Sequence, residues 1–241
     1  LDSGTGKTVT TNGNAQIDPA QSKFGGASGL FDGTGDYLST ADHADWYFGT
    51  GDFTVDLWVR FNNLTGNQIF ASQYVDGQNF WYVRKLVTTH KLYTQFTVGG
   101  VVKGEVTMTN NWAPSANTWY HVAFVRSGSN FYMLIDGVSQ ALTTDTSFGS
   151  NDVGDLATSL LVGAYAGPGN EAYVNGWLDE VRISKGIARW TANFTPPSRN
   201  YGRIEVSDLI AYGNVGIATT TPSYLLHVAR SSDGDVAGFT D

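Results

Sequence analysis

Two acidic residues, Asp179 and Glu180, are adjacent in the segment NGWLDEVRIS, whose pattern is otherwise that of a strand. Neighbouring carboxylates could act together in catalysis, could bind a metal ion, or could lie apart on opposite faces of a sheet. Successive side chains of a strand point to opposite faces, so these two carboxylates cannot act on one substrate. The alternation predicts that Asp179 shares a face with Trp177, and Glu180 with Leu178 and Arg182.

The two acids could also have purely structural roles. Asp179 can accept hydrogen bonds from backbone amides in a turn, and Glu180 can pair with Arg182 or remain in solvent. The alternation of side chains cannot decide between these structural roles and an ion-binding role for Asp179.

No other part of the sequence assembles a catalytic set. Asp52 and Asp56 share a predicted strand face, but Asp52 stands at the start of the strand, so we expect one acid to cap a turn and the other to be solvated. No histidine has a zinc-like spacing partner, and His121 lies in a core-like strand where a structural role is expected. A G-x-S-x-G nucleophile elbow does not occur. We therefore predict that the chain is not an enzyme.

Aromatic residues make up 13% of the chain, and the segment NFWYVRK is the richest in them. Because Phe80 and Tyr82 lie opposite Trp81, one face of this strand gains an exposed or half-exposed ring in either register. Sugars stack their C–H faces on such rings, while polar side chains hydrogen-bond their hydroxyl groups. The candidate ligand contacts are Phe80, Trp81, Tyr82, Trp58, Arg84 and Gln73. For each of them, a place in the core or in a subunit contact is the alternative.

The composition limits the classes of partner. The chain has 241 residues, a formal net charge of −8 and no cluster of Lys or Arg, which argues against nucleic acids and anionic membranes. It contains no cysteine, so thiol catalysis, thiolate metal sites and disulfides are excluded. No apolar run approaches the ~20 residues of a membrane span, and the N-terminal residues lack a signal-peptide pattern.

Alternation at period two recurs along the chain, with turn signals at intervals of roughly ten residues. In DFTVDLWVRF, residues 52–61, the odd-numbered positions form the predicted core face. In TWYHVAFVRS, residues 118–127, both faces are apolar, which indicates a central strand buried on both sides. About twelve short antiparallel strands predict an all-β fold, a two-sheet jelly-roll sandwich. One short helical turn is expected at KGIARW, residues 185–190.

The residue composition of the sequence changes after Pro197. The remaining segment has too little apolar material for a core of its own, so it must pack on the sandwich or on copies of itself. We place the boundary near Asn200, with a β-sandwich over residues 1–200 and an extended β connector over residues 201–241.

Four ordered motifs carry a resemblance over roughly residues 20–195: FGGASGLFDGTGDYLS, GDFTVDLWVRF, NTWYHVAFVRSGSNFYMLIDG and GWLDEVRIS. Their order is similar to that in laminin-G-like, concanavalin A-like sandwich domains. The resemblance implies this fold but not one function, because the fold carries lectins, adhesion modules, glucanases and lyases.

The same resemblance implies a calcium site. In members of the fold that bind calcium, the acid of the matching D-x-V-R motif supplies a ligand, together with groups from the loop near FDGTGDY. By position, this implies Asp179 as the side-chain ligand of a Ca²⁺ ion, with Asp32 and Asp36 or nearby carbonyls completing the site. Oxygen ligands suit Ca²⁺. Sodium or no ion is the alternative.

The segment YGNVGIATTTPSYLLHV resembles the connector that bacteriophage tail-fibre and tail-spike proteins carry ahead of a self-cleaving chaperone domain. Ala218 stands where those connectors usually have glycine. Because the connector lies in a trimeric stalk in those proteins, the resemblance implies a homotrimer that is located on a virion or is otherwise extracellular.

These features together predict a non-enzymatic carbohydrate-binding or adhesion module of a trimeric phage-type fibre or surface protein. The alternative is a structural or assembly role, in which the sandwich decorates a fibre. A glycan-degrading enzyme is the third reading, but the sequence lacks the E-x-D-x-x-E run of glucanases with this fold.

Overall fold

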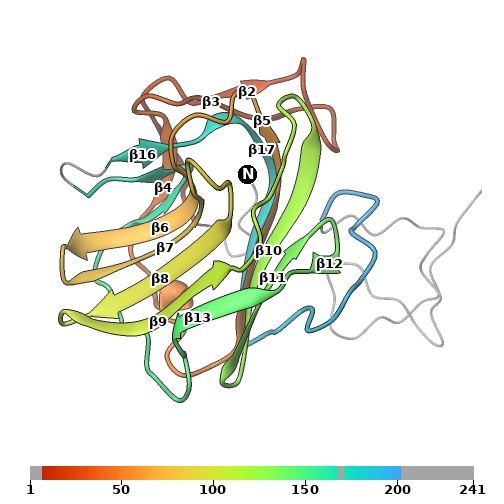
Figure 1. The fold of residues 1–241 in the computed structure, drawn as a ribbon. Coiled ribbons are helices and arrows are strands. Elements are labelled where there is room, and N and C mark those ends of the chain that lie inside the picture. Colours follow the sequence, from red (N-terminus) through yellow and green to blue (C-terminus); the bar gives the residue numbers. More distant parts are fainter. Residues whose placement is uncertain (1–6, 168–170, 202–241) are drawn as a thin grey trace, which may run out of the picture. The chain divides into compact units, whose positions relative to one another are not determined.

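The computed structural model describes residues 7–167 and 171–201, and its main body is two antiparallel β-sheets packed face to face (Figure 1). The chain divides into two units, Leu1–Asn200 and Tyr201–Asp241. Beyond Tyr201, the predicted connector lies outside the described residues. The described residues include no helix that is long and apolar enough to cross a membrane.

Sheet A has eight strands. In spatial order they are β1 (Thr10–Asn12), β4 (Tyr37–Thr40), β14 (Leu160–Val162), β6 (Gln68–Asp76), β7 (Asn79–Lys85), β8 (Leu92–Val98), β9 (Val101–Met108) and β13 (Leu142–Thr146).

Sheet B has seven strands. In spatial order they are β12 (Val138–Ser139), β11 (Asn130–Ile135), β10 (Trp119–Ser127), β5 (Phe53–Phe61), β17 (Asn175–Lys185), β3 (Ser28–Asp32) and β2 (Gln16–Asp18). A hairpin of β15 (Ala164–Tyr165) and β16 (Ala172–Tyr173) and a 3₁₀ turn, η1 (Ala44–Trp46), complete the elements. This arrangement confirms the predicted all-β jelly-roll sandwich.

The core between the sheets follows from strand alternation. The odd-numbered residues of β5, from Phe53 to Phe61, are fully buried, as predicted. Sheet A contributes Trp81 and Phe96, whose rings stack with centroids 5.3 Å apart. Because these side chains fill the space between the layers, the residues between them in sequence point outward.

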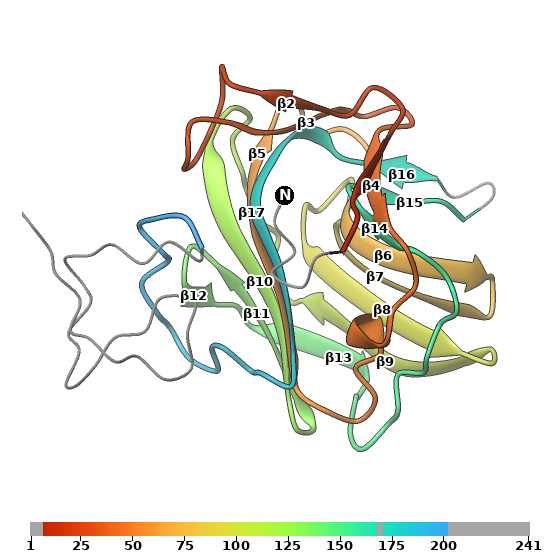
Figure 2. The same ribbon diagram turned by 180° about the vertical axis from the view of Figure 1, so that it is seen from behind.

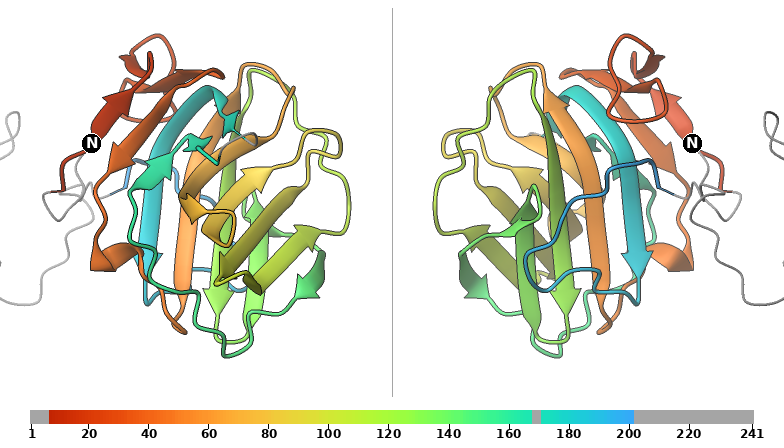
Figure 3. Two further views of the ribbon diagram at one scale, coloured as in Figure 1. Left: turned by 90° about the vertical axis from the view of Figure 1, so that its left-hand side faces the viewer. Right: turned by 90° about the vertical axis from the view of Figure 1, so that its right-hand side faces the viewer.

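Residues 186–194, a segment that we call the strap, cross the outer face of sheet B (Figure 3, right) and cover part of β10 and β11. Trp190 and Phe194 stack with centroids 4.0 Å apart and pack near Ala123 and Val125 of β10. This cover explains why β10 is buried on both faces.

The predicted helical turn at residues 185–190 is wrong, because β17 runs to Lys185 and residues 186–201 contain no helix. Tertiary hydrogen bonds hold the strap instead. Thr54 Oγ1 donates to the Ile187 carbonyl (2.8 Å) and accepts from the Arg189 amide (3.0 Å). The Phe194 amide donates to the Gly137 carbonyl (2.9 Å).

The predicted strand SLLVGAY is divided at Gly163, whose φ of 89° lies in the region that favours glycine. A Cβ at this position would come within 2.8 Å of the Phe31 ring. Before Gly163, β14 pairs with β4 and β6; after it, β15 pairs with β16. The β15–β16 hairpin therefore leaves sheet A and stands beside β6 (Figure 2).

Candidate functional site

An open cavity of about 610 Å³ lies on the face of sheet A that points away from the core. Strands β6 and β7 contribute Tyr74, Phe80, Tyr82 and Arg84, while the β15–β16 hairpin contributes Tyr165 and Tyr173. The volume is within the range of small-molecule binding sites. We call this cavity the groove.

Cross-strand pairing builds the aromatic wall of the groove. Phe80 lies opposite Tyr74 in the β6–β7 register and is stacked on Tyr82, with ring centroids 5.6 Å apart. Tyr165 meets Tyr74, Phe80 and Tyr82 edge to face at centroid distances of 5.1, 6.0 and 5.3 Å. These contacts hold the rings in place before any ligand arrives.

A hydrogen-bond network runs along the outer face beside these rings. The Tyr82 hydroxyl donates to Gln95 Oε1 (2.8 Å). The Tyr93 hydroxyl donates to Glu105 Oε1 and lies 3.1 Å from Gln95 Oε1. Burial raises the pKa of the Tyr82, Tyr93 and Tyr165 phenols. These phenols therefore stay protonated at neutral pH, so they can exchange hydrogen bonds but are poor general bases.

The Arg84 guanidinium lies over two of the tyrosine rings. Its Cζ atom is 4.5 Å from the centroid of Tyr82 and 4.7 Å from that of Tyr93. Its Nε atom is buried and has no hydrogen-bond partner among the described residues.

The structure separates the residues predicted as ligand contacts. Phe80, Tyr82 and Arg84 line the groove. Trp81 and Gln73 instead face the core, each 2% exposed, and the Trp81 indole donates to Gln73 Oε1 (2.8 Å).

Trp58 is 5% exposed on the outer face of sheet B, where it meets the rings of Phe24 and His121. The hypothesis that Trp58, Trp81 and Gln73 contact a ligand therefore does not fit their positions, because tertiary packing already covers all three. Tyr74, Tyr165 and Tyr173 were not predicted as groove residues, because their aromatic residue type was the only signal that the sequence offered.

The three acids predicted to hold calcium do not converge. Asp32 is paired with Asn175 across β3 and β17, four residues along β17 from Asp179 and hence roughly 13 Å away. Asp36 lies beside Asp32 and accepts a hydrogen bond from its amide (2.8 Å). Within the described part of the chain, no three acidic or histidine side chains group to hold a metal ion.

Asp179 acts here as an acceptor for backbone amides. Its Oδ2 atom accepts from the amides of Lys23 (2.8 Å) and Phe24 (3.0 Å), and its Oδ1 atom from that of Glu180 (2.9 Å). A site shared by Asp179, Asp32 and Asp36 does not fit this geometry, so an ion at Asp179 would need other oxygen ligands, such as backbone carbonyls or water. Calcium binding at Asp179 stays a prediction.

A β-bulge changes the faces predicted for β17. Asp179 is paired with Trp58 of β5, whereas Arg182 is paired with Asp56, so two residues of β17 oppose one of β5. Glu180, within the bulge, has a φ of 51°. The extra residue brings Arg182 to the same face as Asp179, so the prediction that Arg182 shares a face with Leu178 is wrong.

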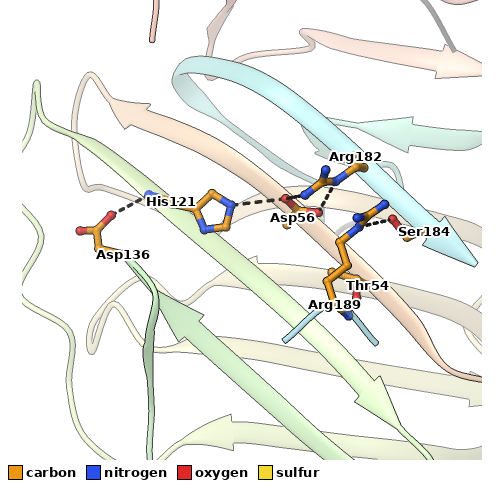
Figure 4. Close-up of polar contacts among 7 residues, drawn as sticks. All are labelled: Thr54, Asp56, His121, Asp136, Arg182, Ser184 and Arg189. Carbon is orange, nitrogen blue, oxygen red and sulfur yellow. Dashed lines mark hydrogen bonds and ion pairs between the residues drawn. The ribbon is translucent and has the colours of Figure 1, made fainter. Parts of the chain in front are cut away.

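Asp56, predicted to be solvated if Asp52 capped a turn, is fully buried on that face. Figure 4 shows its carboxylate between the side chains of Arg182 and His121. Arg182 donates to it through Nε (3.0 Å) and Nη2 (2.9 Å), and His121 Nε2 lies 3.3 Å from Asp56 Oδ2. Asp52, by contrast, does accept the Gly128 amide (2.7 Å) of a turn. The strap rings of Trp190 and Phe194 pack edge-on against His121, so this Asp–His pair is closed to a substrate.

Comparison with known proteins gives one family and several solved structures of similar fold. The family model described as "Concanavalin A-like lectin/glucanases superfamily" matches residues 32–189. No curated protein matches the chain.

Three solved structures illustrate the fold similarity. Domain 4 of the extracellular GH43 arabinanase AbnA from Geobacillus stearothermophilus, in complex with arabinotriose, is 18% identical, with a TM-score of 0.54 over 76% of this chain and 83% of that domain. Domains LG4-5 of the mouse laminin alpha1 chain are 16% identical, with a TM-score of 0.51 over 79% of this chain and 47% of that one. The binding domain of botulinum neurotoxin serotype C1 is 9% identical, with a TM-score of 0.50 over 75% of this chain and 44% of that one. This chain thus spans less than half of the laminin and neurotoxin structures.

We expect Asp56→Asn to lower the free energy of unfolding by about 3 kcal/mol, because the change leaves the Arg182 guanidinium without its carboxylate partner under the strap. The urea denaturation midpoint measures this loss. Asp145→Asn, an exposed acid on β13, is the control and should shift stability by no more than about 0.5 kcal/mol. A loss in Asp56→Asn no larger than in this control would contradict the structural role.

For calcium, we expect calcium chloride to raise the Tm of the wild type but not that of Asp179→Ala, since an ion bound to the native state stabilises it by mass action. Each protein is compared with and without a chelator, which separates the ion's effect from the loss of the amide hydrogen bonds. Asp145→Ala is the matched control and should respond like the wild type. Equal responses in all three proteins would rule out Asp179 as a ligand.

Proposed function

The chain belongs to the concanavalin A-like lectin/glucanases superfamily, and from this premise we propose that it is a non-enzymatic carbohydrate-binding module. The observation that carries the proposal is the groove on sheet A. There, rings from β6, β7 and the β15–β16 hairpin are held around a cavity of about 610 Å³.

The chemistry of the groove suits a sugar. Phe80, Tyr74 and Tyr173 are half-buried, so their rings are packed on one side and accessible on the other. A pyranose or furanose can stack its C–H face on such a ring, and nearby polar groups can bond its hydroxyls. Because the ring positions are fixed by their neighbours, binding would order few side chains.

The solved structures support this proposal at the level of the fold. The arabinanase domain was determined in complex with arabinotriose, and the neurotoxin domain is described as a binding domain. Both have the layered β architecture of this chain, which can present such binding surfaces on its sheets and loops.

The distribution of acids favours binding over hydrolysis. Most glycoside hydrolases place two carboxyl groups on either side of the scissile bond. Among the described residues that line the groove, Glu171 is the one acid. Asp56 and Asp179 are engaged on the other sheet by Arg182 and by backbone amides, respectively.

We further propose that the module belongs to a homotrimeric phage-type fibre or a similar surface protein, extracellular or on a virion. The connector-like segment YGNVGIATTTPSYLLHV supports this context. Three linked sites of low affinity can gain roughly 10² to 10⁴ in avidity when they reach one surface together.

For the groove, we expect Tyr173→Ala to weaken glycan binding by roughly three- to tenfold, since it removes one stacking ring worth ~1 kcal/mol. A glycan array selects the ligand, and isothermal titration calorimetry measures the affinity. Tyr132→Ala, which removes a half-buried ring near the strap on sheet B, is the control and should bind like the wild type. If no glycan binds the wild-type chain, the structural or assembly role becomes the better explanation.

For the fibre context, we expect the full chain to have the mass of a trimer by light scattering, and residues 1–200 alone to have the mass of a monomer. The reason is that the connector is too poor in apolar residues to fold without partners. A monomeric full chain would contradict the trimer, and a trimer of residues 1–200 would move the association to the sandwich.

A further inference from the structure

Arg84 differs from other arginines of the sandwich in having no acceptor. Among the described residues its side chain has no hydrogen bond or ion pair, and its guanidinium instead lies over two tyrosine rings. By contrast, Arg126 donates to the carbonyls of Gly49, Gly149 and Asn151. Among the arginines that the structure describes, Arg84 is thus the one whose guanidinium has no acceptor.

Stacking on tyrosine rings engages the flat faces of a guanidinium and leaves its N–H groups at the edge unused. The Nε–H of Arg84 is out of contact with water and has no acceptor in the described part of the protein. Such a buried donor is unfavourable unless something else accepts from it. The terminal N–H groups of Arg84, by contrast, are not buried, and because Arg84 lines the groove they are the donors that an acceptor in the cavity can reach.

We propose that the groove binds an acidic glycan and that Arg84 binds its anionic group, a carboxylate or a sulfate ester. This inference rests on the proposed carbohydrate-binding function and specifies its ligand. A guanidinium edge offers two parallel N–H groups, whose spacing matches the two oxygens of a carboxylate or two oxygens of a sulfate. The rings of Phe80 and Tyr173 would contact the sugar to which the anion is attached.

The other charged groups around the groove are acidic and repel an anion, so the favourable position for the anion is beside Arg84. Glu171 is exposed on the groove lining, and Glu105 is bonded to the Tyr93 hydroxyl beside it. The formal net charge of the chain is −8. Attraction for an anion is therefore local to Arg84, and removal of the charge on Glu171 should strengthen binding of the acidic glycan.

The test uses the full chain and an array of glycans that contain uronic acid, sialic acid or sulfate, each beside its neutral counterpart. We expect acidic members to bind. The strongest acidic binder and its methyl-esterified or desulfated form then go to calorimetry. Arg84→Gln should weaken the acidic ligand roughly 10- to 100-fold, because it removes charge-assisted hydrogen bonds, and should leave the neutral form nearly unchanged.

Three further variants separate the anion contact from a packing effect. Arg84→Lys keeps the charge but loses the fork, so it should retain part of the affinity. Glu171→Gln should bind the acidic ligand more tightly. Arg60→Gln, which removes an arginine stacked on Trp177 of sheet B, is the matched control and should bind like the wild type.

The outcomes distinguish this inference from the function on which it rests. Binding of neutral glycans alone, or equal affinities of Arg84→Gln and Arg60→Gln for the acidic ligand, would overturn the inference and leave carbohydrate binding in place. Absence of binding to every glycan would remove both. If Arg84→Gln loses affinity for carboxylated or for sulfated glycans but still binds their neutral forms, the result would support the inference and show which anion is bound.

Discussion

Alternation of side chains along each strand governs this molecule, because every strand that fills the core must also send side chains to an outer face. The inner faces meet and exclude water through residues such as Phe53, Trp81 and Phe96. The outer faces are then either covered by other segments of the chain or left open to a ligand. The strap covers part of sheet B, whereas sheet A keeps its outward rings and its unpaired arginine beside an open cavity.

The cover on sheet B depends on one extra residue in β17. Because of the bulge at Glu180, Arg182 reaches the outer face and forms two hydrogen bonds with Asp56, which is fully buried there. Buried charges are tolerated in proteins when they are paired and hydrogen-bonded. His121 and its neighbour Asp56, which could look catalytic in the sequence, are therefore part of the packing under the strap.

The groove on sheet A depends on a different local event. Gly163 ends the pairing of β14 and lets the chain leave sheet A, so that Tyr165 and Tyr173 stand beside rings from β6 and β7. The wall of the groove is thus built from segments that are about ninety residues apart in sequence, and closing a loop of that length costs only slightly more entropy than closing a shorter one. Its rings are fixed by one another, its phenols are neutral, and its cation lacks an acceptor, a combination that suits recognition better than bond cleavage.

The sequence by itself determined the fold class, the inward face of β5 and the double burial of β10, because period-two alternation and turn residues are local signals. It also placed Phe80 and Tyr82 on one face and Trp81 on the other. It could not decide which of these faces meets the core, because that depends on the register of β7 against β6 and β8. Tertiary structure alone decided that Trp81 is core and Arg84 lines a cavity, that Asp56 is buried and that the strap is not helical. Each of these depends on contacts between segments far apart in the chain, and such contacts leave no trace in local pattern.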